Sequence, residues 1–94
     1  MITAIVLIQA EVDRIPEVAE EIVKLDGVSE VYSITGDNDL LAMVRVTRHE
    51  EIAEVVPGRI NKIKGVLHTE THIAFRTYSR HDLDAVFSVG LPEA

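Results

Sequence analysis

A five-residue pattern that occurs twice constrains the fold more than any other feature of this sequence. Residues 24–28 read KLDGV, and residues 62–66 read KIKGV. In each copy a glycine follows the end of a helical segment, where the left-handed backbone that ends helices favours glycine. An apolar residue that begins a strand comes next. The chain is therefore predicted to pass from helix to strand twice, within a length that suits one hydrophobic core.

The residues around these junctions predict four strands and two helices. β-Branched and apolar residues dominate 2–10, 28–35, 40–46 and 66–77, which is typical of strands. Apolar residues recur at three- and four-residue steps in 14–25 and again after Thr47, where Thr47 and Glu50 have the spacing of a capping box. Pro57-Gly58 interrupts the second helical segment, so we expect a kink or a helix that restarts at Pro57. The order predicts an α+β, ferredoxin-like βαββαβ fold, with a four-stranded antiparallel sheet and two helices on one face.

A single domain is expected from a chain of 94 residues. We expect residues 1–78 to form it and residues 79–94 to extend it. In that extension Leu83, Val86 and Phe87 are predicted to make a short packing turn, and the last residues to fray.

The apolar content of the predicted strands implies a second layer over the sheet. If helices cover one face and water the other, the strands should alternate, yet AIVLI at 4–8 and LLAMV at 40–44 are apolar at both parities. A second copy of the sheet would cover the open face and give a two-fold dimer, with the C-terminal segment as the alternative cover.

Charge and composition exclude several classes of function. Nine Lys+Arg against 16 Asp+Glu give a net charge of −7, which disfavours direct binding to nucleic acid. There is no Cys, which fits a reducing cytoplasm and excludes disulfides and thiolate metal sites. The apolar N-terminus lacks the charged region of a signal peptide and is shorter than the ~20 residues that cross a membrane. We therefore expect a cytoplasmic protein that does not bind membranes.

The histidines do not predict a catalytic or metal site. His68 and His72 lie four residues apart on one predicted strand, about 13 Å from each other, which is too far to share an ion. His49 and His81 are expected at the surface. No nucleophile with its base, phosphate loop or calcium loop is present, so we predict no enzyme, cofactor or metal. The alternatives are a small dimeric-barrel enzyme, such as a cofactor-independent monooxygenase with His68 or His72 as base, and an assembly protein without a ligand.

The stretch ITGDNDLL at 34–41 allows two interpretations. Gly, Asp and Asn tolerate the backbone angles of tight turns, so it is a plain hairpin turn in the first. In the second, the amides after Gly36 and a carboxylate from Asp37 or Asp39 bind the carboxylate and ammonium groups of a free amino acid. The hydroxyls of Thr69 and Thr71, on one face of the last strand, would add donors.

The run VYSITGDNDLLAMVRV at 31–46, followed by a helix and then GVLHTETHIAF at 65–75, resembles the effector-sensing domain of the Lrp/AsnC family of transcriptional regulators. The resemblance covers residues 2–78, and it is to a stand-alone form of the domain, without the helix-turn-helix. It implies a dimeric α+β barrel and further assembly into rings such as octamers. It also implies an amino-acid effector near the Gly-x-x-Asp loop, and mixing with full-length Lrp/AsnC regulators. The positions that match the family's site are Gly36, Asp37, Asn38, Asp39, Thr69 and Thr71.

Overall fold

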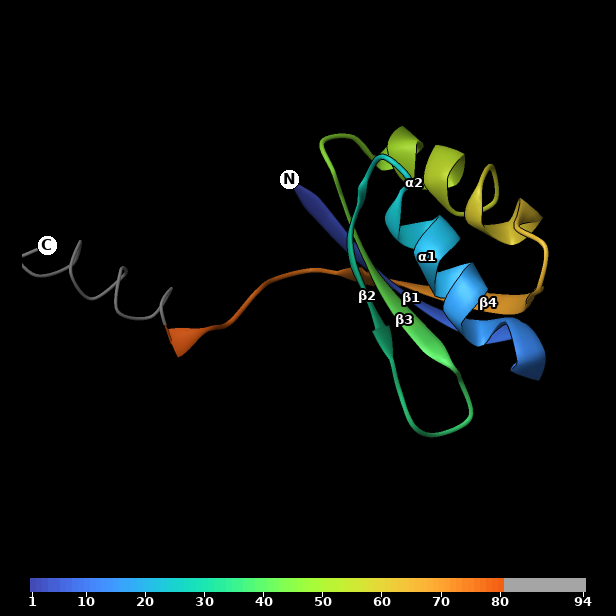
Figure 1. The fold of residues 1–94 in the computed structure, drawn as a ribbon. Coiled ribbons are helices and arrows are strands. Elements are labelled where there is room, and N and C mark those ends of the chain that lie inside the picture. The colour runs from blue at the N-terminus through green and yellow to red at the C-terminus, as the bar shows by residue number, and fades with distance from the viewer. Residues whose placement is uncertain (81–94) are drawn as a thin grey trace, which may run out of the picture.

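Four antiparallel strands form one sheet in a computed structural model of the chain, which describes residues 1–80 (Figure 1). They are β1 (Ile2–Ala10), β2 (Val28–Ser33), β3 (Leu40–Val46) and β4 (Val66–Ala74), in the spatial order β2-β3-β1-β4. The predicted packing turn at Leu83, Val86 and Phe87 lies outside the described residues, as does most of the predicted extension at 79–94.

Two helices, α1 (Ile15–Val23) and α2 (His49–Val55), cover the same face of the sheet (Figure 1). Short 3-10 helices precede β4 at Ile60–Lys62 (η2) and α1 at Val12–Arg14 (η1). This arrangement confirms the predicted ferredoxin-like fold. None of the helices in residues 1–80 has the length and apolar content needed to cross a bilayer.

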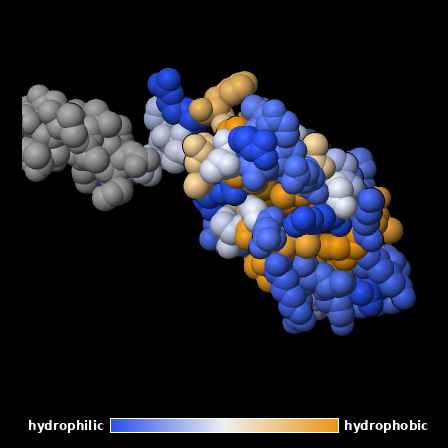
Figure 2. All heavy atoms as spheres, turned by 90° about the horizontal axis from the view of Figure 1, so that it is seen from above, coloured by the Kyte–Doolittle hydropathy of each residue, from blue (hydrophilic) through white to orange (hydrophobic). Residues whose placement is uncertain are grey.

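The core lies between the helices and the inner face of the sheet. Every second residue of β1, from Ala4 to Ala10, is buried there, because β1 is a central strand beneath both helices. The other buried residues are Leu40, Ala42, Val44 and Val46 of β3, and Val18, Ile22, Val55, Val56 and Ile60 of the helical layer. Seen from above, hydrophobic residues show between hydrophilic side chains on the body of the domain (Figure 2).

The predicted element boundaries hold where local chemistry decides them. Pro16 lies in the first turn of α1, and Gly27 has φ +94°, so the glycine takes the predicted left-handed conformation after the helix. β4 stops at Ala74 and not at residue 77, because Ala74 pairs with Thr3, and β1 begins only one residue earlier, at Ile2. Phe75 follows, fully exposed.

Two expectations about the second helix are wrong in detail. The capping carboxylate belongs to Glu51 and not to Glu50, because α2 begins at His49 and Glu51 is its third residue. Pro57-Gly58 does not kink the helix or restart it. Instead α2 ends at Val55, and η2 begins at Ile60.

The outer face of the sheet is apolar in its centre and polar at the β4 edge. The centre is formed by Ile5 and Leu7 of β1 and Leu41 and Met43 of β3, all half-buried. In residues 1–80 no helix covers this face (Figure 1). The polar edge is formed by His68, Glu70 and His72, which pair with Gln9, Leu7 and Ile5.

Candidate functional site

The hairpin between β2 and β3 is open at its tip. A backbone hydrogen bond from Ile34 N to Asp39 O, 3.0 Å long, closes the loop. Gly36 has φ +109°, and no atom lies within 4 Å of where its Cβ would be. Asp37 beside it is exposed. The sharp turn therefore requires glycine for its backbone angle, and it leaves the loop amides accessible to a small molecule.

Asp39 attaches this loop to the end of β1. Its backbone N–H donates to Ile8 O at 2.9 Å, and its Oδ2 accepts a 2.9 Å hydrogen bond from Ala10 N. β1 extends past Leu40, the residue at which β3 begins, so Ala10 has no backbone partner on that side. The Asp39 carboxylate takes the place of the missing strand, which gives this residue a structural role whether or not a ligand binds.

Asp37 is the loop carboxylate that the fold leaves free. Within residues 1–80 its side chain makes no hydrogen bond or ion pair. Its carbonyl oxygen accepts a long hydrogen bond, 3.4 Å, from Gln9 Nε2. Asn38, next to it, is half-buried.

Thr69 lies at the same end of the sheet as the loop, and Thr71 lies farther away. In register Thr69 pairs with Ile8, the residue whose carbonyl accepts the Asp39 N–H. The loop and Thr69 therefore flank β1 from opposite sides, about 10 Å apart at the usual strand spacing. Thr69 Oγ1 donates to Asn61 Oδ1 at 2.7 Å. Thr71 pairs with Val6, two residues farther along β1 from the loop, so it does not join the group at this end.

His68 and His72 are exposed residues of the outer face, and His49 is exposed at the start of α2, whereas His81 lies outside the described residues. His72 Nε2 and Glu70 Oε2 lie 2.7 Å apart, and both side chains are more than half exposed. No group of three or more His, Asp or Glu side chains in the described part of the chain is placed to hold a metal ion.

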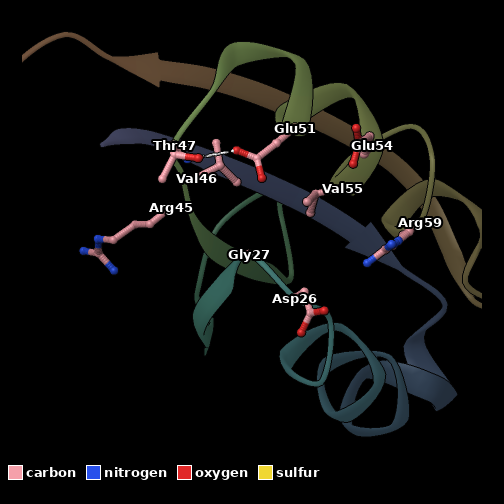
Figure 3. Close-up of a pocket in the computed structure, with 9 residues that line it drawn as sticks. All are labelled: Asp26, Gly27, Arg45, Val46, Thr47, Glu51, Glu54, Val55 and Arg59. Carbon is pink, nitrogen blue, oxygen red and sulfur yellow. Dashed lines mark hydrogen bonds between the residues drawn. The ribbon is translucent and has the colours of Figure 1, made fainter.

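A concave region, which the sequence did not predict, lies at the opposite end of β3 from the 36–39 loop. We call it the valine-floored cleft, because Val46 and Val55 form its base (Figure 3). Its volume is about 340 Å³. The turn from α1 to β2 supplies Asp26 and Gly27, and Arg59 extends over it from the segment after α2 (Figure 3).

One wall of this cleft is held by Glu51. A single oxygen, Oε1, accepts hydrogen bonds from Thr47 Oγ1 at 2.8 Å, Arg48 N at 2.8 Å and Thr47 N at 3.0 Å. The Thr47 hydroxyl and then the Arg48 amide are the main causes that lower the pKa of Glu51. This carboxylate is therefore ionised at neutral pH and engaged in holding the start of α2.

The sequence carries only a weak signal of the cleft. Asp26, Val46 and Arg59 are far apart along the chain, and they meet because α2 packs beside the turn that leaves α1. The KLDGV pattern marks Gly27 as the end of a helix, but it does not indicate what that glycine faces.

The chain is similar to known transcriptional regulators. Residues 3–84 match the family model described as the Lrp/AsnC ligand binding domain. The HTH-type transcriptional regulator PF0250 of Pyrococcus furiosus is 41% identical over 78 residues, which cover 80% of this chain and 52% of that protein. The regulator LysM of Saccharolobus solfataricus is 38% identical over 78 residues, 82% of this chain and 54% of that protein.

A solved structure agrees with this assignment. The crystal structure of TTHA0845 from Thermus thermophilus superimposes with a TM-score of 0.80 at 48% identity, covering 85% of this chain and all of that one. The chain spans about half the length of the curated relatives it matches. These relatives are named as regulators of transcription, which does not favour the enzyme alternative. The chain belongs to the Lrp/AsnC family and contains its ligand-binding domain.

Proposed function

We propose that this chain is a regulatory module that binds a free amino acid at the end of the sheet where the 36–39 loop and Thr69 flank β1. The observation that supports this most directly is the shared attachment at Ile8. Its carbonyl accepts the Asp39 N–H, and it pairs with Thr69 on the other side. The loop and the strand with Thr69, which the sequence indicated independently, thus lie at the same end of the sheet.

The chemical groups at this end of the sheet suit a zwitterion. The free carboxylate of Asp37 can accept hydrogen bonds from an ammonium group, and the open backbone at Gly36 can donate to a carboxylate. A regulator of the same fold, NMB0573 from Neisseria meningitidis, was solved as a complex with L-Met, at 16% identity to this chain.

We further propose that the outer face of the sheet pairs with a second copy. A face with Ile5, Leu7, Leu41 and Met43 at its centre is poorly suited to water, and two such faces can pack at about 10 Å separation. The module would act through this assembly, including higher rings and mixed assemblies with full-length Lrp/AsnC regulators, which would contact the DNA.

The test is calorimetric titration of the protein with each common amino acid, with thermal unfolding of the same samples. Binding to the native state alone stabilises it by about 2.7 kcal/mol at a hundredfold excess over Kd. Asp37→Asn should weaken binding at least tenfold, because it removes the free carboxylate and no bond within the fold. Glu17→Gln, an exposed acid on α1, is the matched control and should leave affinity unchanged. Binding of no amino acid, or equal affinity in Asp37→Asn and wild type, would refute the site.

A further inference from the structure

The outer face of the sheet carries titratable side chains along its edges. Strand pairing places four residues in one row across the sheet, namely Glu30, Met43, Ile5 and His72. The apolar pair lies in the middle of this row, and a charged or titratable side chain lies at each edge. Glu70 stands two residues before His72, on the same face of β4. A second copy that packs on the apolar centre therefore also meets these groups.

Within residues 1–80 Glu70 has a single charge partner, which is a histidine. Its Oε2 lies 2.7 Å from Nε2 of His72, and both side chains are more than half exposed. Histidine changes its charge between about pH 5 and 8. The contact is therefore an ion pair at the acid end of this range and a hydrogen bond to a neutral imidazole at the other end. The charge of Glu70 is balanced only when His72 is protonated.

The elements packed against this pair add no further charge to it. On β1 the paired neighbours are Ile5 and Leu7. The 3-10 helix η2, which carries Lys62, lies on the opposite face of β4 and is hydrogen-bonded to Thr69. On the outer face of β4 the other titratable side chain is His68. The net charge of the pair is therefore set by its own imidazole.

The ion pair at the other edge of the face does not titrate in this range. Glu30 Oε1 lies 3.2 Å from Arg45 Nη1, and an arginine side chain keeps its proton in proteins. With neutral imidazoles, the outer-facing residues of the four strands carry two carboxylates, Glu30 and Glu70, against one cation, so each copy presents one unbalanced negative charge. Protonation of His72 removes this imbalance.

Loss of water on association enlarges the effect of this charge. Half-exposed side chains that border the contact surface lose part of their water when a second copy packs there. A carboxylate without a counter-charge is costly to desolvate, and a cation in contact with it offsets much of that cost. Two copies that each carry a net charge of −7 also repel one another less when imidazoles are protonated. Both effects favour tighter association at lower pH.

We propose that the Glu70–His72 pair makes self-association through the outer face depend on pH, with the assembly favoured on the acid side. This rests on the pairing of two outer faces proposed above and adds a regulatory input to it. Association then takes up protons. Its affinity is highest where His72 is already protonated in the separate copies, and it falls as pH rises until the imidazole is neutral in the assembly as well. Acidification thus acts on the module separately from its effector.

The experiment measures self-association of the full chain by sedimentation velocity between about pH 5.5 and 8 at constant ionic strength, with a fluorescent label so that dissociation can be followed at low concentration. Association should be about tenfold tighter at the acid end, a factor of about three for each of the two symmetry-related pairs, which is the range of exposed ion pairs. His72→Gln should remove most of this dependence. His49→Gln, at an exposed histidine of α2, is the matched control and should keep it.

A second variant tests the carboxylate. Glu70→Gln leaves no negative charge for His72 to balance, so its association should not tighten on acidification. A general effect of net charge would instead leave the tightening intact in both variants.

The outcomes separate this inference from the proposed pairing of the faces. Tightening that is lost in His72→Gln and Glu70→Gln and kept in His49→Gln supports the pair. Association that is equal at all pH values, or that tightens equally in His72→Gln, overturns the inference and leaves the face pairing standing. A chain that does not self-associate, or that associates unchanged in Leu7→Glu, overturns the face pairing and this inference with it.

Discussion

Asp39→Ala should destabilise the domain in the absence of any ligand. The substitution removes the acceptor for Ala10 N, a 2.9 Å hydrogen bond at a part-buried position, and Ala10 itself is only 3% exposed. A hydrogen bond to a charged group contributes ~1.5–3 kcal/mol, and a buried donor left without a partner costs ~1–3 kcal/mol. Since both figures describe the same lost bond, we expect a loss of about 1–3 kcal/mol in the free energy of unfolding.

The measurement is urea unfolding followed by circular dichroism, at several protein concentrations because the proposed self-association would add concentration-dependent stability. Asp39→Asn is the matched variant. Its amide oxygen still accepts from Ala10 N, so it should lose about half as much, in the range of a neutral hydrogen bond, ~0.5–1.5 kcal/mol. If Asp39→Ala changes stability by less than about 0.5 kcal/mol, the carboxylate does not complete the ladder as described. The result also decides how ligand data on Asp39 variants are to be interpreted.

Three further predictions concern the cap, the cleft and the outer face. Glu51→Gln should lower stability most above about pH 4.3, the ordinary pKa of glutamate. The difference in stability between the variant and the wild type should vanish as pH falls through the lowered native pKa of Glu51. Urea midpoints from pH 3 to 7 test this, and a difference that stays constant with pH would contradict it. Gly27→Ala and Gly36→Ala should each cost about 1–2 kcal/mol because of the positive φ, and Gly27→Ala should cost more than Gly36→Ala because its Cβ would lie 3.1 Å from Val55; equal thermal shifts would exclude the crowding. Leu7→Glu should leave the fold intact and weaken self-association at least tenfold by sedimentation velocity, and unchanged assembly would exclude the outer face as the interface.

Local patterns predicted those features that depend on neighbours in the chain. Gly27 could be assigned to a helix end because the residues that decide it are adjacent. The order of helices and strands along the chain followed from the apolar periodicity. Glu50 and Glu51 show the limit. Both could cap a helix, and a shift of one residue in the start of α2 selects the second.

Apart from the Glu51 cap, the contacts described above that the sequence did not predict are tertiary. The bond from Ala10 to Asp39 depends on how far β1 runs past β3, and the bond from Thr69 to Asn61 on the position of η2. The cleft requires α2 to lie beside the turn that contains Gly27. Each joins segments that are separated along the chain and meet only after the layers have packed, so no single window of sequence contains the information.

Because the 36–39 loop is attached to β1, this one strand takes part in both proposed events, ligand binding at the loop and self-association through the outer face. Ile8 and Ala10 hold Asp39, and Leu7, the residue before Ile8 on the same strand, stands on the face proposed to meet a second copy. A ligand that moves the loop would also displace β1, which carries part of the proposed contact surface. Thermodynamic linkage then requires the reverse with equal magnitude, so that assembly changes the affinity of the loop for its ligand by the same factor. A sensor built on this sheet would report concentration of effector and concentration of its own copies as one combined signal.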